Sequence, residues 1–424
     1  MKRKLISVVS LLLSLIVALF SSACTKRVKA ENLMEAITSQ SVVGKEYDEA
    51  FVLTQTQFAL DLFKASVEET GAQNTLISPT SVMIALAMLA NGANGQTKEQ
   101  IQRIIGGGQI TIERLNEYLY YYVNALPSEN KYKLDIANSI WLRDHKDFIV
   151  EKDFLQTNAD YYKADVFKAL FDNSTVNDIN NWVFNKTDGL IKKAIDQIKE
   201  ENIAYLINTV LFDAEWQKIY ESDHVKQEAF VNADGTETDV KMMRDAHYQY
   251  LELANGGGFM KSYKNNAYSF VGLLPNEGVE INEFINSLNA QELVATLTKP
   301  STKYDVYSKL PKFEYDYSVS LNKSLEKMGM KDAFSVEKAD FSRLGTYRKD
   351  EGYNIFVGNV LHKTTIQVGE KGTKAGAVTV IEINGATSAE PREKKYVYLT
   401  RPFVYMIIDN QAKLPIFIGH VNYL

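Results

Sequence analysis

The stretch that decides the fold is Glu370 to Ser388, which reads EKGTKAGAVTVIEINGATS. From Thr373 onward, small and then branched residues occupy every second position as far as Ile383, with a mixed set between them. Because side chains alternate across a β-strand, this pattern predicts a strand with one buried face. The next residues, Gly385 to Pro391, have the composition of an exposed loop tip open to proteolysis. The stretch reads either as an edge strand with a surface turn, or as a segment that is a loop in one state and a strand in another.

A resemblance to a known family favours the second reading. Residues Gly369 to Thr379 resemble the hinge of the serpin reactive-centre loop, where an acidic residue, a glycine and a Thr or Ser precede small residues. The resemblance implies a loop that inserts into a sheet as an extra strand and releases stored strain. It gives hinge roles to Glu370, Gly372, Thr373, Lys374, Ala375, Gly376, Ala377, Val378 and Thr379.

Further motifs that resemble serpins follow in family order from Tyr47 to Leu424. One is the stretch that opens the second helix, where Ser78 can cap the helix and Pro79 suits its first position. Another is the apolar run from Ile203 to Trp216, which predicts a strand buried on both faces. The resemblance implies that Trp216 packs where the loop enters the sheet. It also implies a buried polar cluster, the shutter, made of Ser78, Ser81, Asn208 and His362.

The expected fold class is mixed α/β (α+β). The resemblance implies a serpin fold, with several helices around a large central β-sheet, two smaller sheets and an exposed reactive-centre loop near the C-terminus. The local patterns add a hairpin whose turn contains Asp234 and Gly235. The resemblance also implies a helix from about Ser318 to Met328. Gly256 to Gly258 lacks the Lys-Ser/Thr of a phosphate-binding loop and reads as a flexible hairpin end.

The N-terminus reads as a targeting segment. Residues 1–23 combine a positive start, an apolar core and small residues before Cys24, which is typical of a signal peptide and too short for a comfortable membrane span. The position of Cys24, the only cysteine, resembles a bacterial lipobox and predicts lipidation and membrane anchoring; the alternative is a secreted protein with a free terminal thiol. Residues 24–46 read as a flexible tether, and 47–424 as the serpin domain. The protein is therefore expected outside the cytoplasm, secreted or lipid-anchored at the bacterial cell surface.

Composition argues against other classes of function. The net charge of -6 gives no basic footprint for nucleic acid. The five histidines show no pair at metal-ligand spacing, and the chain has no G-x-S-x-G motif. We therefore expect no metal, no cofactor and no enzymatic activity, although a triad of distant residues stays open at this stage.

The function implied by the resemblance is suicide inhibition of a serine protease, by a monomer that forms a covalent acyl complex with its target. In inhibitory serpins the scissile bond lies fourteen residues past the hinge glycine, which here is Gly372. This count places the bond between Ala386 and Thr387 and suits an elastase-like or subtilisin-like protease. Arg392, which would suit a trypsin-like protease, is the competing position. The alternative function is a non-inhibitory serpin whose loop is a binding surface or a simple substrate.

Overall fold

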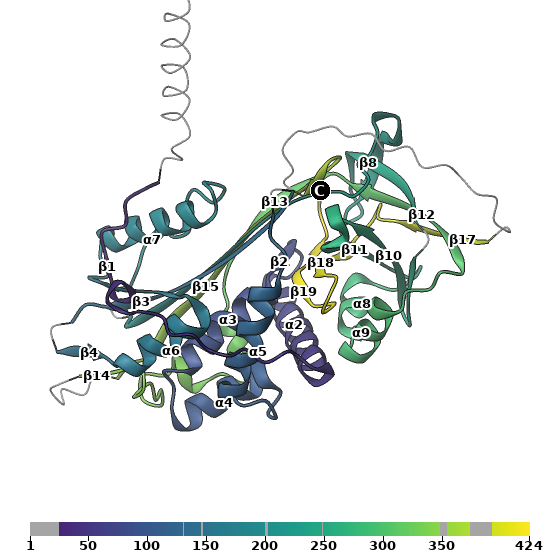
Figure 1. Ribbon diagram of the computed structural model, residues 1–424. Helices are drawn as coiled ribbons and strands as arrows, with labels where there is room; N and C mark the ends of the chain where they lie inside the picture. The colour runs from purple at the N-terminus through teal and green to yellow at the C-terminus, as the bar shows by residue number, and fades with distance from the viewer. Residues whose placement is uncertain are drawn as a thin grey trace, which may run out of the picture.

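The computed structural model describes residues 25–129, 131–145, 147–199, 202–247, 249–347, 354–373 and 392–424. Its backbone is organised around a large mixed sheet that crosses the molecule (Figure 1). The strands of this sheet, in spatial order, are β1 (Glu31–Asn32), β5 (Asp165–Ala169), β3 (Tyr132–Arg143), β6 (Ala204–Glu215), β16 (Gly372–Thr373), β15 (Val357–Gly369) and β13 (Phe313–Ser320).

Strand β6 occupies the centre of this sheet, as its apolar run predicts. Apolar side chains cover both of its faces because α7 (Asn173–Lys186) packs on one face and helices of the main core lie on the other (Figure 1). Tyr205 and Ile207 face α7, whereas Leu206 and Val210 join the main core. A strand buried in this way reads as a nearly continuous apolar run.

Two smaller sheets and a short ribbon complete the β-structure. One consists of β2 (Thr75–Ile77), β19 (Pro415–Val421), β18 (Phe403–Asp409), β11 (Tyr268–Pro275), β10 (Gly256–Ser262) and β9 (Tyr250–Leu253). The other consists of β17 (Glu393–Tyr398), β12 (Tyr304–Pro311), β8 (Glu237–His247) and β7 (Val225–Val231). The ribbon pairs β14 (Gly345–Tyr347) with β4 (Phe148–Val150).

The remaining helices gather below the large sheet and beside the six-stranded sheet (Figure 1). They are α2 (Glu49–Thr70), α3 (Pro79–Ala90), α4 (Gly95–Gly106), α5 (Ile112–Ala125), α6 (Lys152–Tyr162), α8 (Ile281–Ser287), α9 (Ala290–Thr298) and α10 (Asn322–Met328). Helix α3 begins at Pro79 after Ser78, as the sequence predicts, and every one of its side chains is buried. The predicted mixed α/β architecture is confirmed.

Two local predictions were wrong in part. Ser318 belongs to β13, which runs on to Ser320, and α10 begins only at Asn322. Gly256 to Gly258 does close a hairpin, since Gly256 pairs with Leu253 of β9 across a two-residue turn, but the three glycines are the buried start of β10 and not a flexible end. A Cβ atom at Gly258 would lie 2.5 Å from the carbonyl oxygen of Gly272 on β11, so glycine is needed there for close strand packing rather than for flexibility.

Residues 25–46, which were expected to form a flexible tether with Cys24, instead lie along the body. The backbone N–H groups of Lys29 and Ala30 donate to the carboxylate of Asp178 on α7 at 2.9 and 2.8 Å. Glu31 and Asn32 then extend the edge of the large sheet beside β5. The polar composition that suggested a tether belongs to a segment held by backbone hydrogen bonds, which composition does not reveal.

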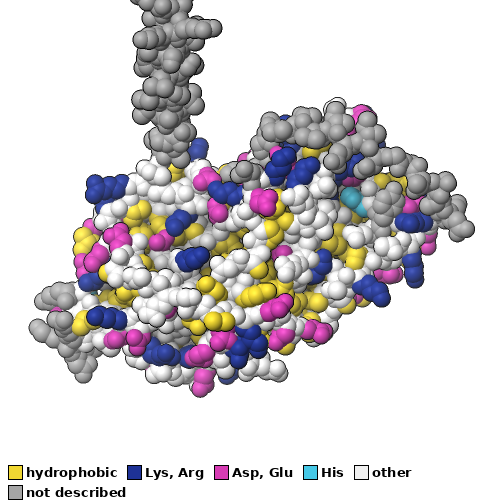
Figure 2. Space-filling model, viewed as in Figure 1, with side chains coloured by type: hydrophobic (Ala, Val, Ile, Leu, Met, Phe, Trp, Pro, Cys, Tyr) yellow, Lys and Arg dark blue, Asp and Glu magenta, His cyan; other side chains and the backbone are white. Residues whose placement is uncertain are grey.

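The described residues contain no helix long and apolar enough to cross a membrane. Figure 2 shows Lys and Arg side chains interspersed with Asp and Glu on the face in view. This mixture agrees with the modest net charge of -6.

Candidate functional site

The hinge of the loop is clamped to the top of the large sheet. Trp216 donates from its indole Nε1 to the Gly369 carbonyl and from its backbone N–H to the Lys371 carbonyl, both at 2.8 Å. Tyr220 N–H donates to the Glu370 carbonyl at 2.9 Å, and the Glu370 carboxylate pairs with Lys312 at 3.1 Å. Trp216, to which the resemblance gives a role where the loop enters the sheet, thus contacts the start of the hinge.

Beyond the clamp, the first two residues of an additional strand are already in place. Gly372 and Thr373 form β16, which pairs antiparallel with both β6 and β15. Thr373 is 2% exposed, and its hydroxyl lies 2.5 Å from the hydroxyl of Tyr263, whose ring stacks on Trp216. Residues Lys374, Ala375, Gly376, Ala377, Val378 and Thr379, and the predicted scissile bond Ala386–Thr387, lie outside the described residues, as does Cys24.

Below β16 the two central strands separate. β6 and β15 pair directly, in parallel, only from Ala204 and Val357 up to Thr209 and Lys363. Between this last pair, Thr209 and Lys363, and Thr373 of β16 lies a narrow cavity of about 20 Å³. Phe212 of β6, Ile366 of β15 and Thr373 itself line it. The sheet therefore holds a gap that continues from the strand that the hinge has begun.

Three of the four predicted shutter side chains meet at the lower end of this gap. Asn208 Nδ2 donates to Ser81 Oγ on α3, and its Oδ1 lies 2.6 Å from His362 Nδ1 on β15. The hydrogen bond between Asn208 and His362 links β6 to β15. These two residues are register partners, one row below the last direct strand pair. All three residues are almost completely buried.

Ser78 joins this cluster through its backbone rather than its hydroxyl. Its N–H donates to His362 Nε2 at 3.0 Å, whereas its Oγ has no partner among the described residues. His362 accepts at Nε2, so its proton is on Nδ1 and points to Asn208. Asn138 of β3, which the sequence analysis did not assign to the cluster, accepts from Asn208 Nδ2 at 2.5 Å. Its position opposite Asn208 in the β3–β6 register could not be read from sequence alone.

Buried histidines make the fold sensitive to acid. Burial lowers the pKa of His362 to about 3 and the pKa values of His247 and His420 to about 4, from an ordinary value of 6.5. Below pH 6.5 the unfolded chain binds protons at these sites and the folded chain does not, so stability falls as pH falls towards about 4. We expect each histidine to lower the free energy of unfolding by up to about 1.4 kcal/mol for each pH unit in this range. Denaturant unfolding midpoints measured between pH 7 and pH 5 test this, and a constant midpoint would contradict it.

The structure also brings a serine and a histidine together. His247 Nε2 on β8 lies 2.8 Å from Ser308 Oγ on the neighbouring strand β12. Ser308 is only 2% exposed, the His247 ring stacks on Phe259 at 4.9 Å, and the nearby Asp245 carboxylate forms an ion pair with Lys261 at 2.6 Å. A hydroxyl enclosed in this way offers no access to a substrate, so the pair gives no support to a hydrolytic site.

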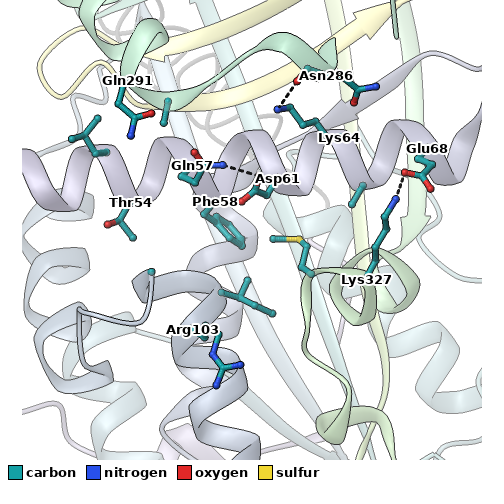
Figure 3. A pocket seen from close by; sticks show the side chains of 16 residues that line it. Thr54, Gln57, Phe58, Asp61, Lys64, Glu68, Arg103, Asn286, Gln291 and Lys327 are labelled. Atoms are coloured by element: carbon teal, nitrogen blue, oxygen red, sulfur yellow. Dashed lines mark hydrogen bonds and ion pairs between the residues drawn. The ribbon is translucent and has the colours of Figure 1, made fainter. Parts of the chain in front are cut away.

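A larger concavity lies on the outer side of α2 (Figure 3), with a volume of about 600 Å³. Most of its charged side chains already have partners within the protein. Lys64 donates to the carbonyls of Asn286 and Leu288, Gln57 donates to Asp61, and Lys327 pairs with Glu68. Most of its polar groups are therefore satisfied without a ligand, and it lies apart from the hinge.

The structure thus combines a clamped hinge with a gap between the two central strands below it. The family described as Serpin (serine protease inhibitor) matches residues 53–424. The chain therefore belongs to the serpin family.

Individual relatives agree with this assignment. Iripin-8 of Ixodes ricinus is 30% identical over 83% of this chain and 88% of its own length. The crystal structure of the thermophilic serpin Tengpin in its native state is 47% identical, with a TM-score of 0.88, and covers 94% of this chain and 100% of that chain. A loop C-sheet serpin polymer is 44% identical, with a TM-score of 0.78, over 91% of this chain and 99% of that chain.

Proposed function

We propose that this serpin is a suicide inhibitor of elastase-like or subtilisin-like serine proteases, and not an enzyme. The protease serine attacks the Ala386 carbonyl, the peptide bond to Thr387 breaks, and the new amino terminus leaves while Ala386 stays esterified to the protease. The freed hinge then inserts between β6 and β15 before water can release the enzyme. The observation that carries this proposal is the buried start of the extra strand at Thr373, directly above the gap.

The residues next in line suit this insertion. Because side chains alternate along a strand, the positions that follow Thr373 on its buried side are Ala375, Ala377 and Thr379. Small side chains of this kind can enter a closed sheet without an unpaired charge, and the inserted strand gains backbone hydrogen bonds on both edges. Charged or bulky residues on that side would favour the non-inhibitory alternative.

The strand register supports the position of the scissile bond. Thr373 pairs with Ala214, so each later loop residue would pair one position earlier on β6, and Ile383 would face Ala204, its first residue. A break after Ala386 lets the inserted strand cover the whole of β6 and carries the protease to its far end. A break after Arg392 would leave nine loop residues beyond the end of β6. Arg392 also adjoins β17, so a protease that cleaves there would have to bind residues of a formed sheet.

We expect the scissile bond to be found by trapping. The protein is mixed with subtilisin, pancreatic elastase or trypsin, and the complexes that survive hot SDS are collected. Mass spectrometry of the released C-terminal peptide should show a first residue at Thr387 or within two positions of it. Trapping that releases a peptide beginning at Glu393 would contradict the assignment, and cleavage without any trapped complex would favour the non-inhibitory alternative.

We further propose that the protein acts outside the cytoplasm. The support is the sequence of residues 1–24, where a signal peptide ends at Cys24 in a setting that resembles a lipobox. Metabolic labelling with a radioactive fatty acid should mark the full-length protein and not a Cys24→Ser variant. An unlabelled parent found in the medium would leave simple secretion as the explanation, and a labelled Cys24→Ser variant would show that the lipid is not attached at Cys24.

A further inference from the structure

A band of tyrosine and lysine side chains covers the outer face of the four-stranded sheet. It comprises Arg244, Tyr307, Lys309, Lys394, Tyr396 and Tyr398, which we call the Tyr–Lys face. The rings of Tyr307 and Tyr396 are stacked with centroids 5.6 Å apart, and Tyr396 meets Tyr398 edge-on at 5.5 Å. Tyr396 is 57% exposed, which makes it one of the large apolar side chains that the described residues leave in solvent.

The face is held in shape by its own charges. Lys309 lies over the Tyr398 ring at 4.6 Å, and Lys394 lies over the Tyr307 ring at 5.7 Å. The Glu228 carboxylate binds both Arg244 and Lys309, at 2.7 and 2.5 Å, and so offsets one of these two positive charges. Lys394 forms no ion pair with any described residue. Asp305 of β12 is the register partner of Lys394 but forms no ion pair with it. The face therefore presents rigid aromatic area with a net positive charge, since three cations stand against Glu228 and Asp305.

The position of this face follows from the chain itself. Strand β17 carries three of the six residues and begins at Glu393, six residues after Thr387. Six extended residues span at most about 20 Å, and a protease domain of about 250 residues has a radius of gyration of about 18 Å. A protease bound at the proposed scissile bond is therefore within reach of the face. Tyrosine and arginine on a rigid strand are the side chains that most often dominate binding at protein interfaces.

We propose that the Tyr–Lys face is an exosite for the target protease, and that it binds a partner whose surface beside the active-site cleft is apolar with at least one exposed carboxylate. This inference rests on the proposed inhibitory function and adds the chemistry of the partner. The carboxylate would pair with Lys394, and the apolar surface would pack on Tyr396 and Tyr307. Docking on the face would speed formation of the encounter complex without altering loop insertion, which occurs on the large sheet.

The test uses the protease that forms the SDS-stable complex in the trapping experiment. Tyr396→Ala and Lys394→Glu should each lower the second-order rate constant of inhibition about tenfold, with the inhibitor-to-protease stoichiometry unchanged. The rate loss of Lys394→Glu should shrink at high salt, because the lost attraction is electrostatic. Val336→Ala and Lys323→Glu are matched controls, since both residues are exposed and lie away from β17.

Three results would overturn the exosite. Rate constants of both variants within twofold of the parent would remove the face from the interface. A changed stoichiometry at an unchanged rate would assign it to loop insertion instead. A dimer of the parent that becomes a monomer in Tyr396→Ala would assign it to self-association. If the parent traps no protease at all, that result contradicts the proposed inhibitory function itself, and the exosite that rests on it is then also rejected. Should Tyr396→Ala fold poorly, the charge reversal at Lys394 still decides.

Discussion

Thr373→Arg and Ala375→Asp are each expected to turn the inhibitor into a substrate. Thr373 already lies in the gap, among Phe212, Ile366 and Tyr263, where an arginine would carry an unpaired charge into the sheet. Such a charge costs about 3–5 kcal/mol, and each 1.4 kcal/mol slows insertion about tenfold if the transition state bears the full cost. Deacylation would then precede insertion. Titration of protease activity should show the stoichiometry of inhibition rising from about one to above ten, with the loop cleaved at its normal bond.

The matched control is Lys374→Asp, which places a charge of the same kind one residue away. Strand alternation puts position 374 on the side opposite Thr373, where neighbouring strands carry the exposed residues Glu314 and Gln367. This variant should trap protease as the parent does. If Thr373→Arg and Ala375→Asp also retain the parent's yield of covalent complex, strand insertion is not the mechanism.

Sequence patterns predicted the parts of this molecule that depend on local periodicity or on a family motif. The apolar run around Asn208 became the central strand β6, and Ser78-Pro79 marked the start of α3. The hinge was assigned from the motif at Gly369 to Thr379 that resembles serpins, because the alternation alone left an ordinary edge strand open. In each case the signal lies within one stretch of chain, where a period or a cap can be read directly.

The features that sequence did not predict depend on residues that meet across the fold. Asp178 holds the N-terminal segment from a helix about 150 positions away, and Asn138 enters the shutter only because β3 pairs with β6 in one register. Ser308 faces His247 for the same kind of reason, and the Tyr–Lys face is assembled from three strands. Gly258 was misread because loop composition and close strand packing both call for glycine.

His362→Ala should weaken the fold and promote incorrect insertion of the loop. The histidine accepts from Ser78 N–H at 3.0 Å and donates to Asn208 at 2.6 Å, at the row below the point where β6 and β15 separate. Any inserting strand must break this bond between the two strands. Its loss leaves two buried polar groups without partners, at about 1–3 kcal/mol each, and removes a lock on the gap. Because this lock on the gap is lost, we also expect faster polymer formation on warming.

His420→Ala supplies the control that separates these hydrogen bonds from simple loss of packing. His420 is also buried, on β19, but neither of its ring nitrogens has a partner among the described residues. Both variants remove the same buried side chain and leave a cavity of similar size. The difference between their unfolding midpoints therefore measures the contribution of the shutter hydrogen bonds to stability. We expect His362→Ala to be less stable than His420→Ala by about 2–4 kcal/mol, and to form polymers sooner by native gel electrophoresis. Equal midpoints and equal polymer yields would show that the cluster does not hold β6 and β15 together.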